Sequence, residues 1–183
     1  MHKLRQSLDH LRELGADDRL ESLSPADRSM LTTAVLAEIR PPRGSNESIS
    51  DDDLRSQIAQ MGIKPIDLNG DGVPEIVLQG SVDFCSPTGN CAFWVFMRSA
   101  NGLKLILNRG AVRTFAVEDS INNGFHDLLL GMHGSATEQG LFVYRFIDGS
   151  YRRTACYKAS WTRLVDDEVK ELEEPDIQPC GKR

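Results

Sequence analysis

The sequence predicts an α+β protein in which N-terminal helices pack on a mainly antiparallel sheet of about six strands. The first sixty residues carry apolar side chains at helical spacing, whereas from residue 63 onward short β-branched and aromatic runs alternate with glycine-containing turns. A weak internal duplication divides the strand region into two related three-stranded units, at about 63–110 and 111–160. We therefore expect a helical segment 1–62, a β domain 63–162 and an acidic tail 163–183.

Length and composition are those of one soluble globular domain. The chain has 183 residues, 40% hydrophobic and 26% charged, and a formal net charge of -6. Because it has no basic cluster and no apolar run near the roughly 20 residues of a membrane helix, we expect neither nucleic-acid binding nor membrane insertion. Its expected assembly state is a monomer or a small homo-oligomer.

The first predicted helix is an amphipathic segment near the N-terminus. Leu4, Leu8, Leu11 and Leu14 follow one another at spacings of four, three and three residues, which places them on one helical face. Gly15 is a suitable end for this helix.

Two further helices begin at serine caps. Ser24 precedes Pro25, which favours the first helical position, and the helix must stop at Pro41. Ser50 precedes three aspartates that suit the first turn of a short helix, and Gly62 fits its C-terminal end. The aspartates are interpreted as capping residues and not as metal ligands.

Seven short runs in the second part of the chain have the composition of strands. They are rich in β-branched and aromatic residues and are separated by turn-forming pairs such as Asn-Gly and Asp-Gly. The runs are 74–80, 91–99, 103–108, 112–118, 126–131, 140–147 and 150–158. After residue 161 the chain becomes acidic and loses its periodicity, and we expect a loosely held tail, with a short solvated helix as the alternative.

The duplication rests on two matching segments. Each has an Asn-Gly turn, an acidic residue entering an apolar strand, a variable loop and an aromatic hairpin. In this alignment Asn69 matches Asn123, and Glu75 matches Asp127.

The four cysteines allow three pairings, of which we prefer the local one first. Cys85 and Cys91 bracket a short stretch of turn formers, so a bridge between them needs little chain rearrangement. Cys156 and Cys180 remain, and Cys180 lies in a tail that can fold back. Stable disulfides imply an oxidising compartment, so we expect a periplasmic or secreted protein whose leader has been removed. The alternative is a cytoplasmic protein with reduced thiols.

The stretch "DLNGDGVPE" is a candidate calcium loop. Asp67, Asn69 and Asp71 present oxygen-bearing side chains at every second position, and the two glycines after them permit a tight turn. The carbonyl of Val73 and the carboxylate of Glu75 would complete a shell of hard oxygen ligands, which suits calcium. A strand follows the loop, so it is not an EF-hand. An Asx-rich turn without metal is the alternative.

The same stretch, extended to "DLNGDGVPEIVLQG", resembles the calcium loop and strand of FG-GAP/VCBS repeats. The resemblance implies that residues 67, 69, 71, 73 and 75 are ligands, with Asn at the usual middle Asp and Glu at the usual last Asp. It covers about fifteen residues. The wider layout is similar to a group of uncharacterised bacterial, often exported, proteins and implies no activity. The second copy has lost the alternation, so we expect one calcium ion with a structural role.

The function expected from these features is that of a small non-enzymatic module that binds or inhibits another protein. The partner is not identified by the sequence. The alternative is a hydrolase or metal-dependent enzyme built from His126, His133, Ser135 and Glu138, which crowd into one stretch. Convergence of His133, Ser135 and Glu138 in a concave pocket would favour the enzyme, and a flat or convex exposed loop would favour a binding surface.

Overall fold

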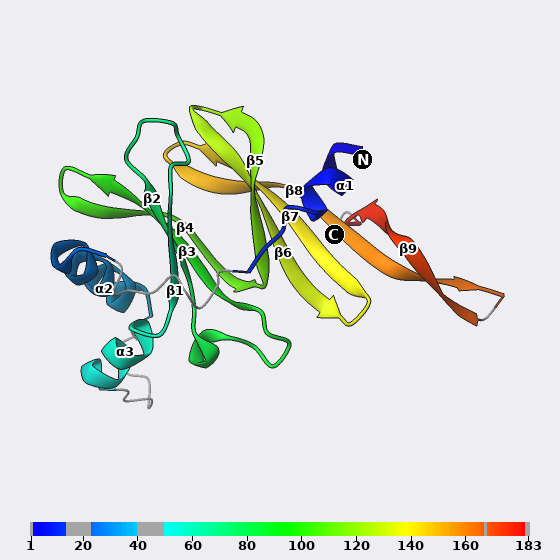
Figure 1. The fold of residues 1–183 in the computed structure, drawn as a ribbon, viewed down its shortest axis with the longest axis horizontal. Helices are drawn as coiled ribbons and strands as arrows, with labels where there is room; N and C mark the ends of the chain where they lie inside the picture. Colours follow the sequence, from blue (N-terminus) through cyan, green and yellow to red (C-terminus); the bar gives the residue numbers. More distant parts are fainter. Residues whose placement is uncertain (1, 14–22, 40–49, 167, 182–183) are drawn as a thin grey trace.

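The computed structural model describes residues 2–13, 23–39, 50–166 and 168–181, and within them the chain is mostly β (Figure 1). Four strands form one antiparallel sheet in the order β1-β2-β3-β4, and five form a second in the order β5-β6-β7-β8-β9. The first sheet contains β1 (Gly62–Ile66), β2 (Glu75–Gln79), β3 (Cys91–Ser99) and β4 (Gly102–Val112). The second contains β5 (Thr114–Asn122), β6 (Phe125–Ser135), β7 (Glu138–Ile147), β8 (Ser150–Val165) and β9 (Glu168–Pro179).

The two sheets pack face to face, and continuous apolar runs supply both faces of each sheet. In β3, Phe93 and Val95 lie in the core between the sheets, whereas Trp94 and Phe96 lie in the core on the other side. In β6, Leu129 faces away from the neighbours on either side of it. Because successive side chains of a strand point to opposite faces, such runs require both faces to be covered.

Helices cover the outer faces of both sheets. α2 (Pro25–Ile39) and α3 (Asp51–Ile58) pack on the first sheet, and α1 (His2–Leu8) contributes Leu4 and Leu8 to the apolar cluster on the second sheet. Figure 1 shows the helices on opposite sides of the paired sheets. None of the described helices is long and apolar enough to cross a membrane.

Both predicted serine caps are confirmed. The backbone N–H of Asp27 donates to Ser24 Oγ at 3.2 Å, and that of Asp53 donates to Ser50 Oγ at 3.1 Å. Each bond satisfies a donor that a helix leaves open at its first turn.

Two predicted helix ends are wrong. α1 ends at Leu8 because the chain becomes extended and Arg12 pairs with Phe115 of β5. Leu14 and Gly15 lie outside the described residues. α3 ends at Ile58, and Gly62 begins β1 instead of ending the helix.

The expectation of one sheet of about six strands is corrected to two sheets of four and five strands. β1 and β9 were not expected as strands. The acidic tail, expected to be loosely held, pairs with β8 from Val165↔Glu168 to Tyr157↔Pro179, and the Cys156–Cys180 disulfide holds its end. Strand pairing overrides the weak local pattern of this segment, because β8 offers it an open edge.

The strand order follows the chain in both sheets. β2, β3 and β4 form an antiparallel meander in the first sheet, and β6, β7 and β8 form one in the second. β1 and β5 precede these meanders and lie at one edge of their sheets.

Candidate functional site

The candidate calcium loop connects β1 to β2 at one end of the first sheet. Its residue Leu68 accepts a hydrogen bond at its carbonyl from the backbone N–H of His126 in β6, at 2.8 Å. Leu68 itself is fully buried in the core between the sheets. The loop therefore joins the two sheets as well as the two strands.

Short polar side chains organise the loop from within. Asp67 accepts hydrogen bonds from the backbone N–H groups of Gly70 at 2.7 Å and Gly72 at 3.0 Å. Asp71 accepts from the backbone N–H of Val73 at 2.7 Å. Gly70 and Gly72 have φ values of 74° and 80°, which side-chain-bearing residues rarely adopt, so glycine is favoured at both positions.

Glu75 closes the loop and is buried. Glu75 is 2% exposed, and its Oε2 accepts a hydrogen bond from the backbone N–H of Leu68 at 2.9 Å. Burial raises the pKa of the Glu75 carboxyl, and the negative charges of Asp71 and Asp67 raise it further. In the described part of the chain, no basic side chain forms an ion pair with any of these three carboxylates.

The loop contains the types of oxygen donor that calcium prefers, and the side chains of Asp67, Asn69 and Asp71 already accept backbone N–H groups of the loop. Asp67, Asp71 and Glu75 supply carboxylate oxygens, Asn69 an amide oxygen and Val73 a backbone carbonyl. Within the described residues, however, no three Asp, Glu, His or Cys side chains are grouped closely enough to hold an ion by themselves. The amide, the carbonyl and water would have to complete the shell.

The matching carboxylate of the second unit is neutralised by protein groups. Asp127 is 1% exposed, and it accepts hydrogen bonds from the Ser120 hydroxyl at 2.8 Å and the Asn122 amide at 2.7 Å. The guanidinium of Arg145 lies 3.4 Å from its Oδ2. A buried carboxylate with these partners needs no bound cation.

Tyr151 lies close to both buried carboxylates. Its hydroxyl donates to the carbonyl of His126 at 2.8 Å. Burial raises the pKa of the Tyr151 phenol, and the charges of Glu75 and Asp127 raise it further. The two turns of the duplicated units therefore approach each other at one end of the paired sheets, around a phenol that stays protonated.

Of the residues of the alternative enzymatic site, His133, Ser135 and Glu138 lie at the end of the β6–β7 hairpin, and His126 lies apart from them. His126 lies at the start of β6, where its Nδ1 contacts the carbonyl of Glu118 at 2.7 Å, and His133 lies seven residues further along the same strand. This spacing separates the two histidines by roughly 23 Å. Ser135 is exposed at the hairpin end, and Glu138 forms an ion pair with Lys158 at 2.5 Å. The predicted loop here is a continuous hairpin between β6 and β7.

Both predicted disulfides are present, Cys85–Cys91 and Cys156–Cys180, and the chain has no free cysteine. The first closes a loop that contacts β6. The side-chain amide of Asn90 in this loop donates to the carbonyl of His133 at 2.9 Å. Its Oδ1 accepts a hydrogen bond from the backbone N–H of His133 at 2.7 Å. The short disulfide loop thus becomes a second connection between the sheets.

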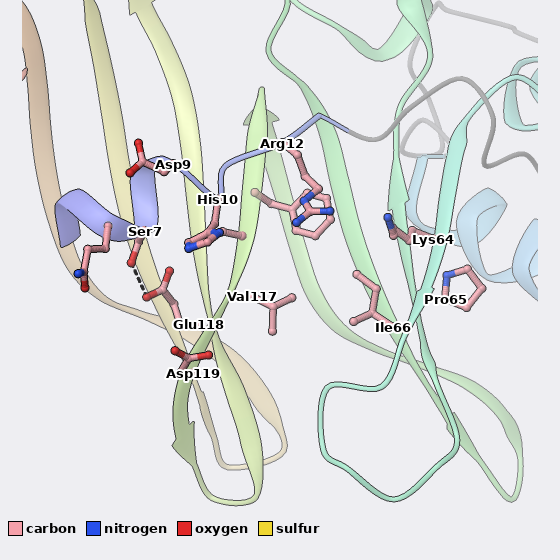
Figure 2. Close-up of a pocket in the computed structure, with 13 residues that line it drawn as sticks. Ser7, Asp9, His10, Arg12, Lys64, Pro65, Ile66, Val117, Glu118 and Asp119 are labelled. Atoms are coloured by element: carbon pink, nitrogen blue, oxygen red, sulfur yellow. Dashed lines mark hydrogen bonds between the residues drawn. The ribbon is translucent and has the colours of Figure 1, made fainter. Parts of the chain in front are cut away.

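A groove of about 800 Å³ lies between the open edges of the two sheets (Figure 2). Its lining comes from the end of α1 and the segment after it, from β1 and from β5. This volume is within the usual range of ligand sites, roughly 300–1,000 Å³. Sequence reasoning missed the groove because β1 was not expected, and the residues that line it carry no local motif.

Comparison of the chain with models of known protein families, with curated proteins and with solved structures finds no match in any of the three.

Proposed function

We propose that this protein is a non-enzymatic binding module that works outside the cytoplasm and holds one structural calcium ion in the loop 67–75. The observation that carries the binding role is the groove between two sheet edges, which is concave and has both apolar and charged walls. The residues of the alternative enzyme lie on an exposed hairpin and at the far end of its first strand. The geometry thus favours binding over hydrolysis.

The calcium assignment is supported by the charge of the loop. Glu75 is buried, the charges of Asp71 and Asp67 raise the pKa of its carboxyl, and no described basic side chain forms an ion pair with these three carboxylates. Burying a carboxylate without a counter-charge is costly, and a bound cation would remove that cost. The resemblance of the loop to FG-GAP/VCBS repeats supports the same assignment. When bound, calcium would supply positive charge and cross-link the loop.

The disulfides support the proposed compartment. Two disulfides persist in an oxidising environment and are rare in the reducing cytoplasm. A periplasmic or secreted location is therefore proposed, and it agrees with millimolar-range calcium outside cells as the source of the ion.

The proposed function is tested by capture of a partner from extracts of the source cells. The disulfide-bonded protein is immobilised, and extract is passed over it in calcium and, separately, in a chelator. We expect one saturable protein partner that excess free protein displaces and that is retained less well in chelator, because the loop also joins the two sheets. Absence of any displaceable partner in calcium would contradict the binding role.

A further inference from the structure

The groove lies between two strands that each form a sheet edge. β1 is the first strand of the four-stranded sheet and β5 the first of the five-stranded sheet, and each pairs with one neighbour along the sheet. Figure 2 shows Ile66 of β1 and Val117 of β5 facing each other across the groove. Both side chains are partly buried against the core between the sheets. The floor of the groove is therefore the open margin of that core.

The edge of β5 already accepts an extended segment of this chain. The backbone N–H of Arg12 donates to the carbonyl of Phe115 at 3.0 Å, and the N–H of Phe115 donates to the carbonyl of Arg12 at 2.9 Å. This antiparallel bridge is isolated, so it covers one residue of the edge. Since alternate residues of a strand direct their backbone groups to the same edge, Val117 presents the next donor and acceptor to the groove.

The opposite edge is unsuited to strand pairing. β1 contains Pro65, which has no backbone N–H to donate, and proline is found on edge strands for this reason. The two walls of the groove thus differ: β5 can form a ladder of hydrogen bonds with a new strand, and β1 can contribute side-chain contacts.

Carboxylates are concentrated on one side of the groove. Asp9, Glu118 and Asp119 line the side formed by α1 and β5, where Arg12 also lies, and Lys64 lies on the side of β1 (Figure 2). Glu118 accepts a hydrogen bond from Ser7 at 2.7 Å, and Asp119 is exposed. A basic side chain beside Asp119 would therefore be favoured on the β5 wall.

We propose that the groove binds an extended peptide segment of the protein partner, which adds to β5 as an edge strand next to the Arg12 bridge. An apolar side chain of this segment contacts Ile66 and Val117, and a lysine or arginine two residues away pairs with Asp119. Alternate side chains of a strand share one face, so this spacing brings both to the groove. The inference rests on the proposed binding function and specifies its site and partner class.

The test uses a displayed library of random linear heptapeptides selected on the intact disulfide-bonded protein. We expect enriched peptides that share an apolar residue and a basic residue two positions apart. Synthetic copies are then measured by fluorescence anisotropy against the wild-type protein, Asp119→Lys and Asp83→Lys. Asp83 is exposed outside the groove and gives the same change of charge. We expect at least tenfold weaker binding to Asp119→Lys and an unchanged affinity for Asp83→Lys.

A second measurement tests the backbone contact independently of the Asp119 variant. Two peptides are made, one methylated at the amide nitrogens of its odd-numbered residues and one at those of its even-numbered residues. Binding of one of the two should be at least tenfold weaker, because only alternate residues direct their N–H groups to β5. Hydrogen exchange at the Val117 amide should slow when the unmethylated peptide binds. Failure to enrich any peptide, equal binding to Asp119→Lys, or full binding of both methylated peptides would each overturn the inference. If a captured partner is retained equally by Asp119→Lys, the binding function stands and this site for it is wrong.

Discussion

Glu75 and Asp127, which the sequence alignment of the two predicted units matches, are both buried, but their surroundings differ. Asp127 accepts hydrogen bonds from Ser120 and Asn122 and lies beside Arg145. Glu75 accepts the backbone N–H of Leu68 and has two further carboxylates nearby. Asp127 therefore has a counter-charge within the protein, whereas Glu75 has none among the described ion pairs, and this is why we propose a cation there.

The connections before the two carboxylates explain the difference. β5 and β6 are joined by Asn123 and Gly124, whose φ values of 49° and 83° are those of a tight hairpin turn that needs no ligand. β1 and β2 are joined by the longer loop 67–74. A longer loop loses more conformational entropy when it is ordered, and an ion that cross-links its oxygens offsets that cost.

The largest expected effect comes from removing the carboxylate of Asp127, whose hydrogen-bond and ion-pair partners all belong to the protein. Asp127→Ala should lower the free energy of unfolding by about 2–4 kcal/mol, because hydrogen bonds to a buried charge are lost and their donors are left without an acceptor. Urea unfolding in calcium and in chelator should give the same loss, since Asp127 has its counter-charge within the protein. A loss that depends on calcium would show that the two carboxylates are not independent.

An intermediate effect on stability is expected when Glu75 is changed, and its sign should differ between calcium and chelator. Calcium at 100 times its dissociation constant should stabilise the wild-type protein by about 2.7 kcal/mol. Glu75→Gln should lose most of this gain but be more stable than wild type in chelator by about 1 kcal/mol, because the amide carries no buried charge and still accepts the Leu68 N–H. Thermal melts of both proteins, with and without calcium, measure these differences.

The matched control for this variant is Glu138→Gln, which removes an exposed carboxylate paired with Lys158. It should leave the response to calcium unchanged. A wild-type melt that is the same in calcium and in chelator would contradict the calcium site.

The smallest expected effect is at a partly buried carboxylate outside both units. Asp27 at the start of α2 pairs with Arg98, and hydrogen bonds from Arg98 and Ser24 lower the pKa of its carboxyl below the usual 3.8. Its contribution is therefore fully present above pH 3.8 and is lost as the pH falls through the lowered pKa. Asp27→Asn should cost less than about 1 kcal/mol at neutral pH and less than that at a pH below 3.8, as measured by urea unfolding. An equal loss at both pH values would contradict the ion pair.

Local rules account for much of what was predicted correctly. The serine caps depend on bonds within one turn, so Ser24 and Ser50 could be identified without knowledge of the fold. The Cys85–Cys91 bridge closes a loop so short that few alternatives exist. Apolar runs such as that around Trp94 indicated strands, and β3 forms there.

Features that depend on distant partners were predicted poorly. The acidic residues of β9 have no strand-like pattern, and they form a strand because β8 offers an edge and Cys156 holds the end. α1 was expected to extend past Leu8, but pairing of Arg12 with Phe115 ends it, across more than a hundred residues of sequence. Neither pairing could be deduced from neighbouring residues.

The sequence by itself determined the oxygen-rich loop at Asp67 to Glu75, the helix starts and the strand-forming runs, because each depends on side chains only a few positions apart. Only the tertiary structure decided that the strands divide into two facing sheets, that Arg145 neutralises Asp127, and that β1 and β5 border a groove. Those features depend on contacts between segments far apart in the chain, and such contacts form only when the whole core is packed.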